Sequence, residues 1–188
     1  MKISIPELSL VVLIGPSASG KSTFAKRHFI LSEILSDNVN SDQKIKYEHL
    51  TDSTPGASLE SDFERLHAQA VARLISGNLT VVESSFSGEI AEQEITRKAW
   101  VSLAKQYHFL PVAIILNPLG LSPFNSMLSD LAREGFRHVF ELKSELEIDQ
   151  VEIVRQPLLS NLKNDRGPFD LIGDVHGCLD ELIELLTS

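Results

Sequence analysis

Hydrophobic and polar residues follow two patterns that alternate along this chain. Short apolar runs rich in leucine and β-branched residues predict strands at Leu8–Ile14, Glu33–Ser36, Leu79–Glu83, Leu110–Leu116 and Arg137–Leu142. Between them, apolar residues recur at helical spacing, which predicts helices over Lys21–Phe29, from Ser61 to a stop at Gly77, over Ile90–Gln106, before Arg133 and over Ser144–Ile148. This alternation favours a three-layer α/β fold, in which helices flank a central parallel sheet on both faces.

The apolar pattern also predicts which elements lie in the middle of the fold and which lie at its edge. The first and fourth apolar runs, Leu10–Ile14 and Leu110–Leu116, are uninterrupted, so we expect both strands near the middle of the sheet. We expect Val151–Val154 to add an edge strand. In the helix over Ile90–Gln106, the inner face is predicted to carry Ile95, Ala99, Leu103 and Ala104.

The character of the chain changes after Pro157, where a polar stretch begins. We therefore expect a first domain over residues 1–157, a linker over 158–168 and the start of a second domain over 169–188. The second segment opens with a short apolar run and ends in an amphipathic helix.

Composition narrows the classes of function. The 188 residues carry 26 acidic and 17 basic side chains, a formal net charge of −9, which argues against broad, sequence-independent binding of nucleic acid. Cys178 stands alone, so an internal disulfide is excluded and a reducing compartment is favoured. No apolar run approaches the ~20 residues of a membrane span, and we expect a cytoplasmic protein without a membrane partner.

The first predicted strand runs directly into Gly15-Pro16-Ser17-Ala18-Ser19-Gly20-Lys21-Ser22, a match to the phosphate-loop pattern G-x-x-x-x-G-K-[ST]. The two glycines allow backbone N–H groups to converge on a phosphate at the start of the next helix. Lys21 is then placed to reach the β- and γ-phosphates, and the Ser22 hydroxyl to ligate Mg²⁺. The sequence thus predicts binding of ATP or another nucleoside triphosphate with Mg²⁺, at Gly15, Ser17, Ala18, Ser19, Gly20, Lys21, Ser22 and Thr23.

Two carboxylates follow predicted strands, at the edge of a parallel sheet where ligands bind. Asp37 follows the second strand and is a candidate base for an acceptor hydroxyl, or simply part of a turn. Glu83 ends the third strand and is a candidate Mg²⁺ ligand, or a solvated strand end. Positive charge for phosphoryl transfer is scarce: no Lys or Arg lies between the fourth strand and Arg133, so Arg133 and Arg137 are the nearest candidates.

Near the C-terminus, Asp174 and His176 have the D-x-H spacing of two metal ligands on one turn. A two-metal centre needs further carboxylates, histidines and an asparagine from later segments, and no histidine or asparagine follows His176 here. We therefore expect no phosphoesterase activity from this incomplete metal motif.

Several stretches together resemble the bacterial polynucleotide kinase-phosphatase family of RNA end repair. These are LSLVVLIGPSASGKSTFAKRHF, LSD ending on Asp37, NLTVVESS, REGFRHVFEL, VRQP and FDLIGDVHGCLDEL. The resemblance implies a P-loop 5′-hydroxyl kinase domain followed by the start of a metallophosphoesterase domain. It also implies Lys21 and Ser22 for triphosphate and Mg²⁺, Asp37 as the general base, and 5′-OH RNA or DNA ends as the acceptor.

The chain departs from that family at three points. Asn40 stands where the family has an arginine that holds the acceptor phosphate, and the segment 117–130 is too short for the family's arginine-bearing lid. The family's VDATN motif reads Val82-Glu83-Ser84-Ser85 here. These departures predict a polynucleotide kinase with reduced or lost transfer, with Lys44, Lys46, Arg133 or Arg137 standing in for the arginines. A nucleotide-binding structural module and a kinase for a small-molecule hydroxyl remain as alternatives.

Overall fold

The computed structural model describes residues 1–36, 59–83, 90–158, 166 and 178–187. The chain divides into two units, Met1–Leu158 and Leu159–Ser188, which are considered separately.

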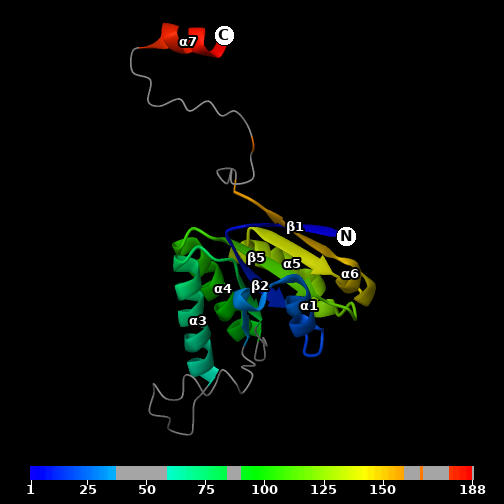
Figure 1. Ribbon diagram of the computed structural model, residues 1–188. Helices are drawn as coiled ribbons and strands as arrows, with labels where there is room; N and C mark the ends of the chain where they lie inside the picture. The colour runs from blue at the N-terminus through cyan, green and yellow to red at the C-terminus, as the bar shows by residue number, and fades with distance from the viewer. Residues whose placement is uncertain (37–58, 84–89, 159–165, 167–177, 188) are drawn as a thin grey trace. The chain divides into compact units, whose positions relative to one another are not determined.

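Five parallel strands form the main sheet of the first unit (Figure 1). In sheet order they are β3 (Ile34–Ser36), β4 (Thr80–Glu83), β2 (Ser9–Ile14), β5 (Leu110–Leu116) and β6 (His138–Leu142). The central strand β2 is buried along its whole length, and its Val12 pairs with Val82 on one side and Ala113 on the other. The expected parallel α/β sheet with the first apolar run at its centre is confirmed.

Helices cover both faces of this sheet. They are α1 (Lys21–His28), the short 3₁₀ helix η1 (Leu31–Glu33), α3 (Leu59–Ile75), α4 (Ile90–Gln106), α5 (Ser122–Glu134) and α6 (Glu145–Gln150). Because side chains alternate along a strand, β2 sends Val12 into a core shared with α3, α4 and α5, and Val11 into a core shared with α1. Figure 1 shows α3 and α4 together on one side and α1 on the other.

A strand that the sequence pattern did not single out begins the chain. Strand β1 (Lys2–Pro6) pairs in parallel with β7 (Glu152–Gln156) in a separate two-stranded sheet. The expected strand over Val151–Val154 is therefore present as β7, but it pairs with β1 and not with an edge of the main sheet. The physical reason is that Ile3 and Ile5 of β1 are buried in the core beside α1, which places β1 where β7 can pair with it.

The inner face of α4 also differs from the prediction. Ile95 is 70% exposed, and Arg97 and Trp100 are buried in its place. Arg97 donates through Nε and Nη2 to the two carboxylate oxygens of Glu134 on α5, at 2.9 and 2.6 Å, with both side chains 4% exposed. A charged side chain with a matched partner therefore occupies a position that a hydrophobicity pattern assigns to the surface.

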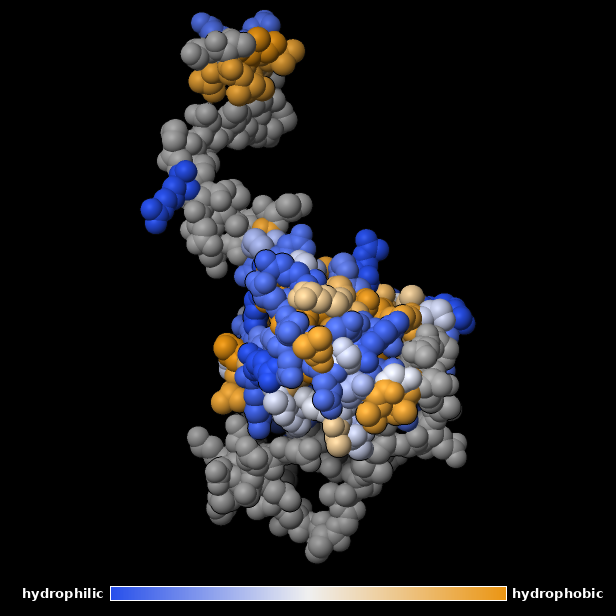
Figure 2. All heavy atoms as spheres, turned by 90° about the vertical axis from the view of Figure 1, so that its right-hand side faces the viewer, coloured by the Kyte–Doolittle hydropathy of each residue, from blue (hydrophilic) through white to orange (hydrophobic). Residues whose placement is uncertain are grey.

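The second unit contains one described helix, α7 (Leu179–Thr187), whose apolar residues gather in one patch in Figure 2. Asp174 and His176 lie outside the described residues. Among the described residues, no helix is long and apolar enough to cross a membrane.

Candidate nucleotide-binding site at the phosphate loop

The loop from Gly15 to Gly20 connects the end of β2 to the first turn of α1. Ala18 and Gly20 adopt left-handed backbone conformations, with φ of 62° and 85°, which lets the chain turn sharply into the helix. No side chain caps the helix at Gly20, and its first turn holds no acidic residue. The positive end of α1 is therefore left for an anion from outside the chain.

Gly15 fixes how closely the loop packs against the sheet. A Cβ at this position would lie 2.5 Å from the carbonyl oxygen of Leu116 and 2.7 Å from Ser19 Oγ. The residue must therefore be glycine for the loop to rest on the end of β5. Ser19 is 6% exposed, and its Oγ has no hydrogen-bond partner among the described residues. A buried hydroxyl without a partner is unfavourable, and a phosphate oxygen would satisfy it.

Lys21 lies folded back over the loop. Its Nζ donates to the carbonyl oxygens of Gly15 at 2.8 Å and Pro16 at 2.9 Å, which uses two of its three donors. Burial lowers the pKa of Lys21 below its usual value, and the negative charge of Glu83 acts against that shift. Lys21 is 8% exposed and its charge is only partly compensated, a situation that bound phosphate would relieve.

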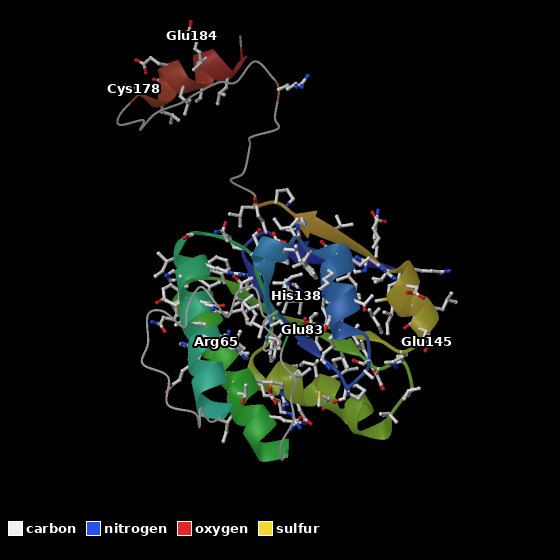
Figure 3. All side chains as sticks on the ribbon, turned by 60° about the horizontal axis from the view of Figure 1, so that its bottom comes forward. Arg65, Glu83, His138, Glu145, Cys178 and Glu184 are labelled. Carbon is white, nitrogen blue, oxygen red and sulfur yellow. The ribbon has the colours of Figure 1, made fainter. Side chains whose placement is uncertain are left out.

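Ser22 and Glu83 meet beside this lysine. Glu83 pairs with Leu13 in the register of β4 and β2, so its carboxylate lies at the start of α1, where Ser22 Oγ donates to Glu83 Oε1. Glu83 is 7% exposed, and Figure 3 shows it beside α1 in the middle of the unit. A hydroxyl and a carboxylate oxygen are the ligands that Mg²⁺ prefers. No cluster of three or more Asp, Glu, His or Cys able to hold a metal occurs among the described residues.

These residues fit a triphosphate with its metal, because the loop brings together the Lys21 ammonium, the buried Ser19 hydroxyl and the oxygen pair of Ser22 and Glu83. Comparison with known proteins gives the family. A family profile described as "AAA domain" matches residues 10–119, which spans the phosphate loop, β4 and β5. This chain belongs to the AAA domain family.

Two further comparisons add less. Among the solved chains that match is a "putative kinase" from Chloroflexus aurantiacus J-10-fl, at 17% sequence identity and a TM-score of 0.40, covering 79% of this chain and 88% of that one. A TM-score at this level carries no argument about function. No curated protein matches the sequence at a significant level.

The other predicted residues of this AAA domain lie in different places. Asp37 follows β3 directly but is outside the described residues, as are Asn40, Lys44 and Lys46. The last described residue before it, Ser36, pairs with Glu83 in the register of β3 and β4. Strand β3, which ends directly before Asp37 in the sequence, is therefore the neighbour of β4, the strand that carries the candidate metal ligand Glu83.

Arg133 and Arg137 are at the wrong end of the sheet to serve the phosphate loop. Arg137 directly precedes β6 and its backbone N–H donates to the carbonyl of Pro111 near the start of β5, at 2.8 Å. Arg133 lies in the last turn of α5, where its exposed side chain pairs with Asp130 at 3.2 Å. The phosphate loop follows the carboxyl end of β2, so the expectation that either arginine replaces the missing ones is wrong.

Asn117, which the sequence reasoning passed over, shapes the segment after β5. It is fully buried; its Oδ1 accepts from Leu121 N at 2.8 Å, and its backbone oxygen accepts from Gly120 N at 3.0 Å. The result is a closed turn that leaves Leu119 74% exposed. The signal for it was the Asn-Pro-x-Gly sequence, which is typical of a tight turn. This turn adjoins the phosphate loop, because Gly15 rests on the preceding carbonyl of Leu116.

Proposed function

We propose that this AAA domain is an ATP-dependent kinase of the polynucleotide 5′-hydroxyl type that works at a reduced rate. The observation that supports the proposal is the grouping of Lys21, Ser22 and Glu83 at a loop whose buried Ser19 hydroxyl has no partner among the described residues. That grouping supports triphosphate binding, and the resemblance of the sequence to RNA end-repair kinases supports the acceptor.

In the proposed reaction, the 5′-oxygen of the acceptor attacks the γ-phosphorus and the bond from that phosphorus to the bridging oxygen of ADP breaks. The acceptor proton passes to the Asp37 carboxylate, so ADP and a 5′-phosphate end are the products. Lys21 holds the phosphates and shifts toward them from the carbonyls of Gly15 and Pro16. Mg²⁺, held by Ser22 with Glu83 directly or through water, would supply charge neutralisation at the phosphates.

The reduced rate follows from the charge available at the transferred group. The segment after β5 is a tight turn with exposed Leu119, and the arginines nearest in sequence lie at the other end of the sheet. An arginine at the transferred phosphoryl group contributes ~10³–10⁵ in rate in related P-loop systems. The same turn favours a second candidate, a nucleotide-binding module that transfers nothing; a kinase for a small hydroxyl compound is the third.

One assay separates the three candidates. Native protein, Asp37→Ala and Lys21→Ala are incubated with γ-labelled ATP and a 5′-OH oligonucleotide, and ATP binding is measured in parallel by calorimetry. Transfer that both substitutions abolish supports the polynucleotide kinase. ATP binding without transfer overturns it in favour of the binding module, and transfer confined to small alcohols identifies the third candidate.

A further inference from the structure

A second group of charges lies at the opposite end of α1 from the phosphate loop, where the side chain of Glu33 is 11% exposed and that of Arg155 is 39% exposed. Arg155 of β7 donates through Nη1 and Nη2 to the two carboxylate oxygens of Glu33, both at 2.6 Å. Its guanidinium carbon lies 6.0 Å from the ring centroid of Phe29, the residue that ends α1. A fork-to-fork pair of this kind fixes both distance and orientation. The pair therefore joins β7 to the end of the helix that begins at the phosphate loop.

Glu33 also organises the short segment between α1 and β3. Its Oε2 accepts from the backbone N–H of Ile30 at 3.2 Å, and Glu33 itself closes η1 immediately before β3. On the other side, Arg73 of α3 donates to the carbonyl of Ile34, the first residue of β3, at 3.2 Å. Burial lowers the pKa of Arg73, and the charge of Glu33 acts against that shift, which places the two groups in one electrostatic cluster.

Strand β3 needs such support because it is three residues long and lies at the edge of the sheet. Its ladder to β4 has only the pairs from Ile34 to Ser36. A strand this short does not hold its register by backbone pairing alone. Glu33 and Arg73 therefore fix where β3 starts. Because the strand is short, this also determines where it ends, at Ser36 beside Glu83.

We propose that Glu33 and Arg155 are positioning residues that hold β3 to β7 and to the end of α1, and thereby set where the chain enters the acceptor side of the site. This inference rests on the proposed function, in which the residue after β3 is the general base.

The chain contains a matched control for a purely structural pair. Arg97 and Glu134 form the same two-bond contact at 2.9 and 2.6 Å, and they are more deeply buried than Glu33 and Arg155. They join α4 to α5. Arg97→Met and Arg155→Met therefore each remove a two-bond ion pair, and the second of these pairs involves the residue that directly precedes β3.

The test compares these two variants and Glu33→Gln with the native protein, at a temperature where all are folded. Arg155→Met and Glu33→Gln should lower kcat for transfer to a 5′-OH oligonucleotide about tenfold or more, because a general base displaced by about 1 Å loses most of its effect. The Kd for MgATP should stay within about twofold, since the phosphate loop is at the other end of α1. Arg97→Met should change neither. Equal loss of kcat in Arg97→Met, or loss of ATP affinity together with kcat, overturns the inference.

A second measurement tests the positioning role independently of whether the protein has the proposed kinase activity. Amide hydrogen exchange at Leu35 and Ser36 reports the stability of β3 without any turnover. Faster exchange in Arg155→Met than in Arg97→Met supports the positioning role even if the native protein transfers no phosphate, in which case the proposed function alone fails. Equal exchange in the two variants overturns the positioning role whatever the activity.

Discussion

The two ends of helix α1 hold charged side chains in different ways. At the start, the Lys21 ammonium is held by two carbonyl oxygens, and Ser19 Oγ is buried with no partner among the described residues. At the other end, the Arg155 guanidinium meets both oxygens of Glu33 in full. Unpaired buried donors raise the free energy of the empty protein and are relieved by a ligand, whereas a matched pair is complete without one. This difference distinguishes the ligand-binding site at the start of α1 from the structural contact between elements at its end.

The largest effect should come from removing the lysine at the binding end. Lys21→Ala should weaken ATP binding about 10- to 100-fold, the equivalent of ~1.5–3 kcal/mol for hydrogen bonds to a charged group. The free energy of unfolding should change little, because the free protein compensates this ammonium poorly. Calorimetric titration with MgATP measures the first and urea unfolding the second. The control is Lys26→Ala, which removes an exposed lysine on the same helix. Equal ATP affinity in the native protein and in Lys21→Ala would show that the phosphate loop is not the ATP-binding site.

Removing the pair of Glu33 and Arg155 should have the opposite result, a loss of stability without a loss of ATP binding. Glu33→Gln leaves the partly exposed Arg155 guanidinium without its counter-charge, so the free energy of unfolding should fall by about 0.5–1.5 kcal/mol while MgATP affinity is kept. Chemical denaturation followed by circular dichroism gives the loss. Glu152→Gln breaks the exposed pair between Lys2 and Glu152, at 3.4 Å, and should lower stability by less than about 0.5 kcal/mol. A loss as large in Glu152→Gln would contradict the distinction.

A smaller effect of opposite sign is expected at Ser19. Ser19→Ala removes a buried hydroxyl that has no described partner, so the free energy of unfolding should stay the same or rise by up to ~1 kcal/mol. MgATP affinity should fall a few-fold, by ~0.5–1.5 kcal/mol for one lost hydrogen bond. Thermal unfolding with and without MgATP measures both. A clear loss of stability in the free variant would show that the hydroxyl already has a structural role.

The smallest effect is a pH dependence at the binding end. Burial places the pKa of Lys21 in the free protein below its usual 10.5, and ATP binding needs the protonated ammonium. MgATP affinity should therefore decline with rising pH before an ordinary lysine titrates. The unfolded chain holds that proton more tightly, so the Lys21 contribution to folding stability rises with pH between the lowered pKa and 10.5. Calorimetry from neutral to alkaline pH tests this; Lys21→Arg, which stays charged, should flatten the curve.

Much of the fold and the centre of the site could be predicted from the sequence. The predicted bounds of Ile90–Gln106 and Leu110–Leu116 are those observed, because both segments are long and strongly patterned. The phosphate loop was also predicted, since its turn, glycines, lysine and hydroxyl are neighbours in sequence. Glu83 was found as a strand-end carboxylate, although its direct contact with Ser22 required the order of the strands.

What the sequence by itself determined was therefore local: the type of most elements, the phosphate loop, and the residues at the strand ends. The tertiary structure alone decided the pairing of β1 with β7, the joining of Glu33 to Arg155 across 122 positions, and the burial of Arg97 against Glu134. It also decided that Arg133 and Arg137 lie at the end of the sheet away from the loop. The reason is physical: periodicity reports how each segment meets the core, but the partner of a charge or a strand edge is set by which segments the sheet order brings together.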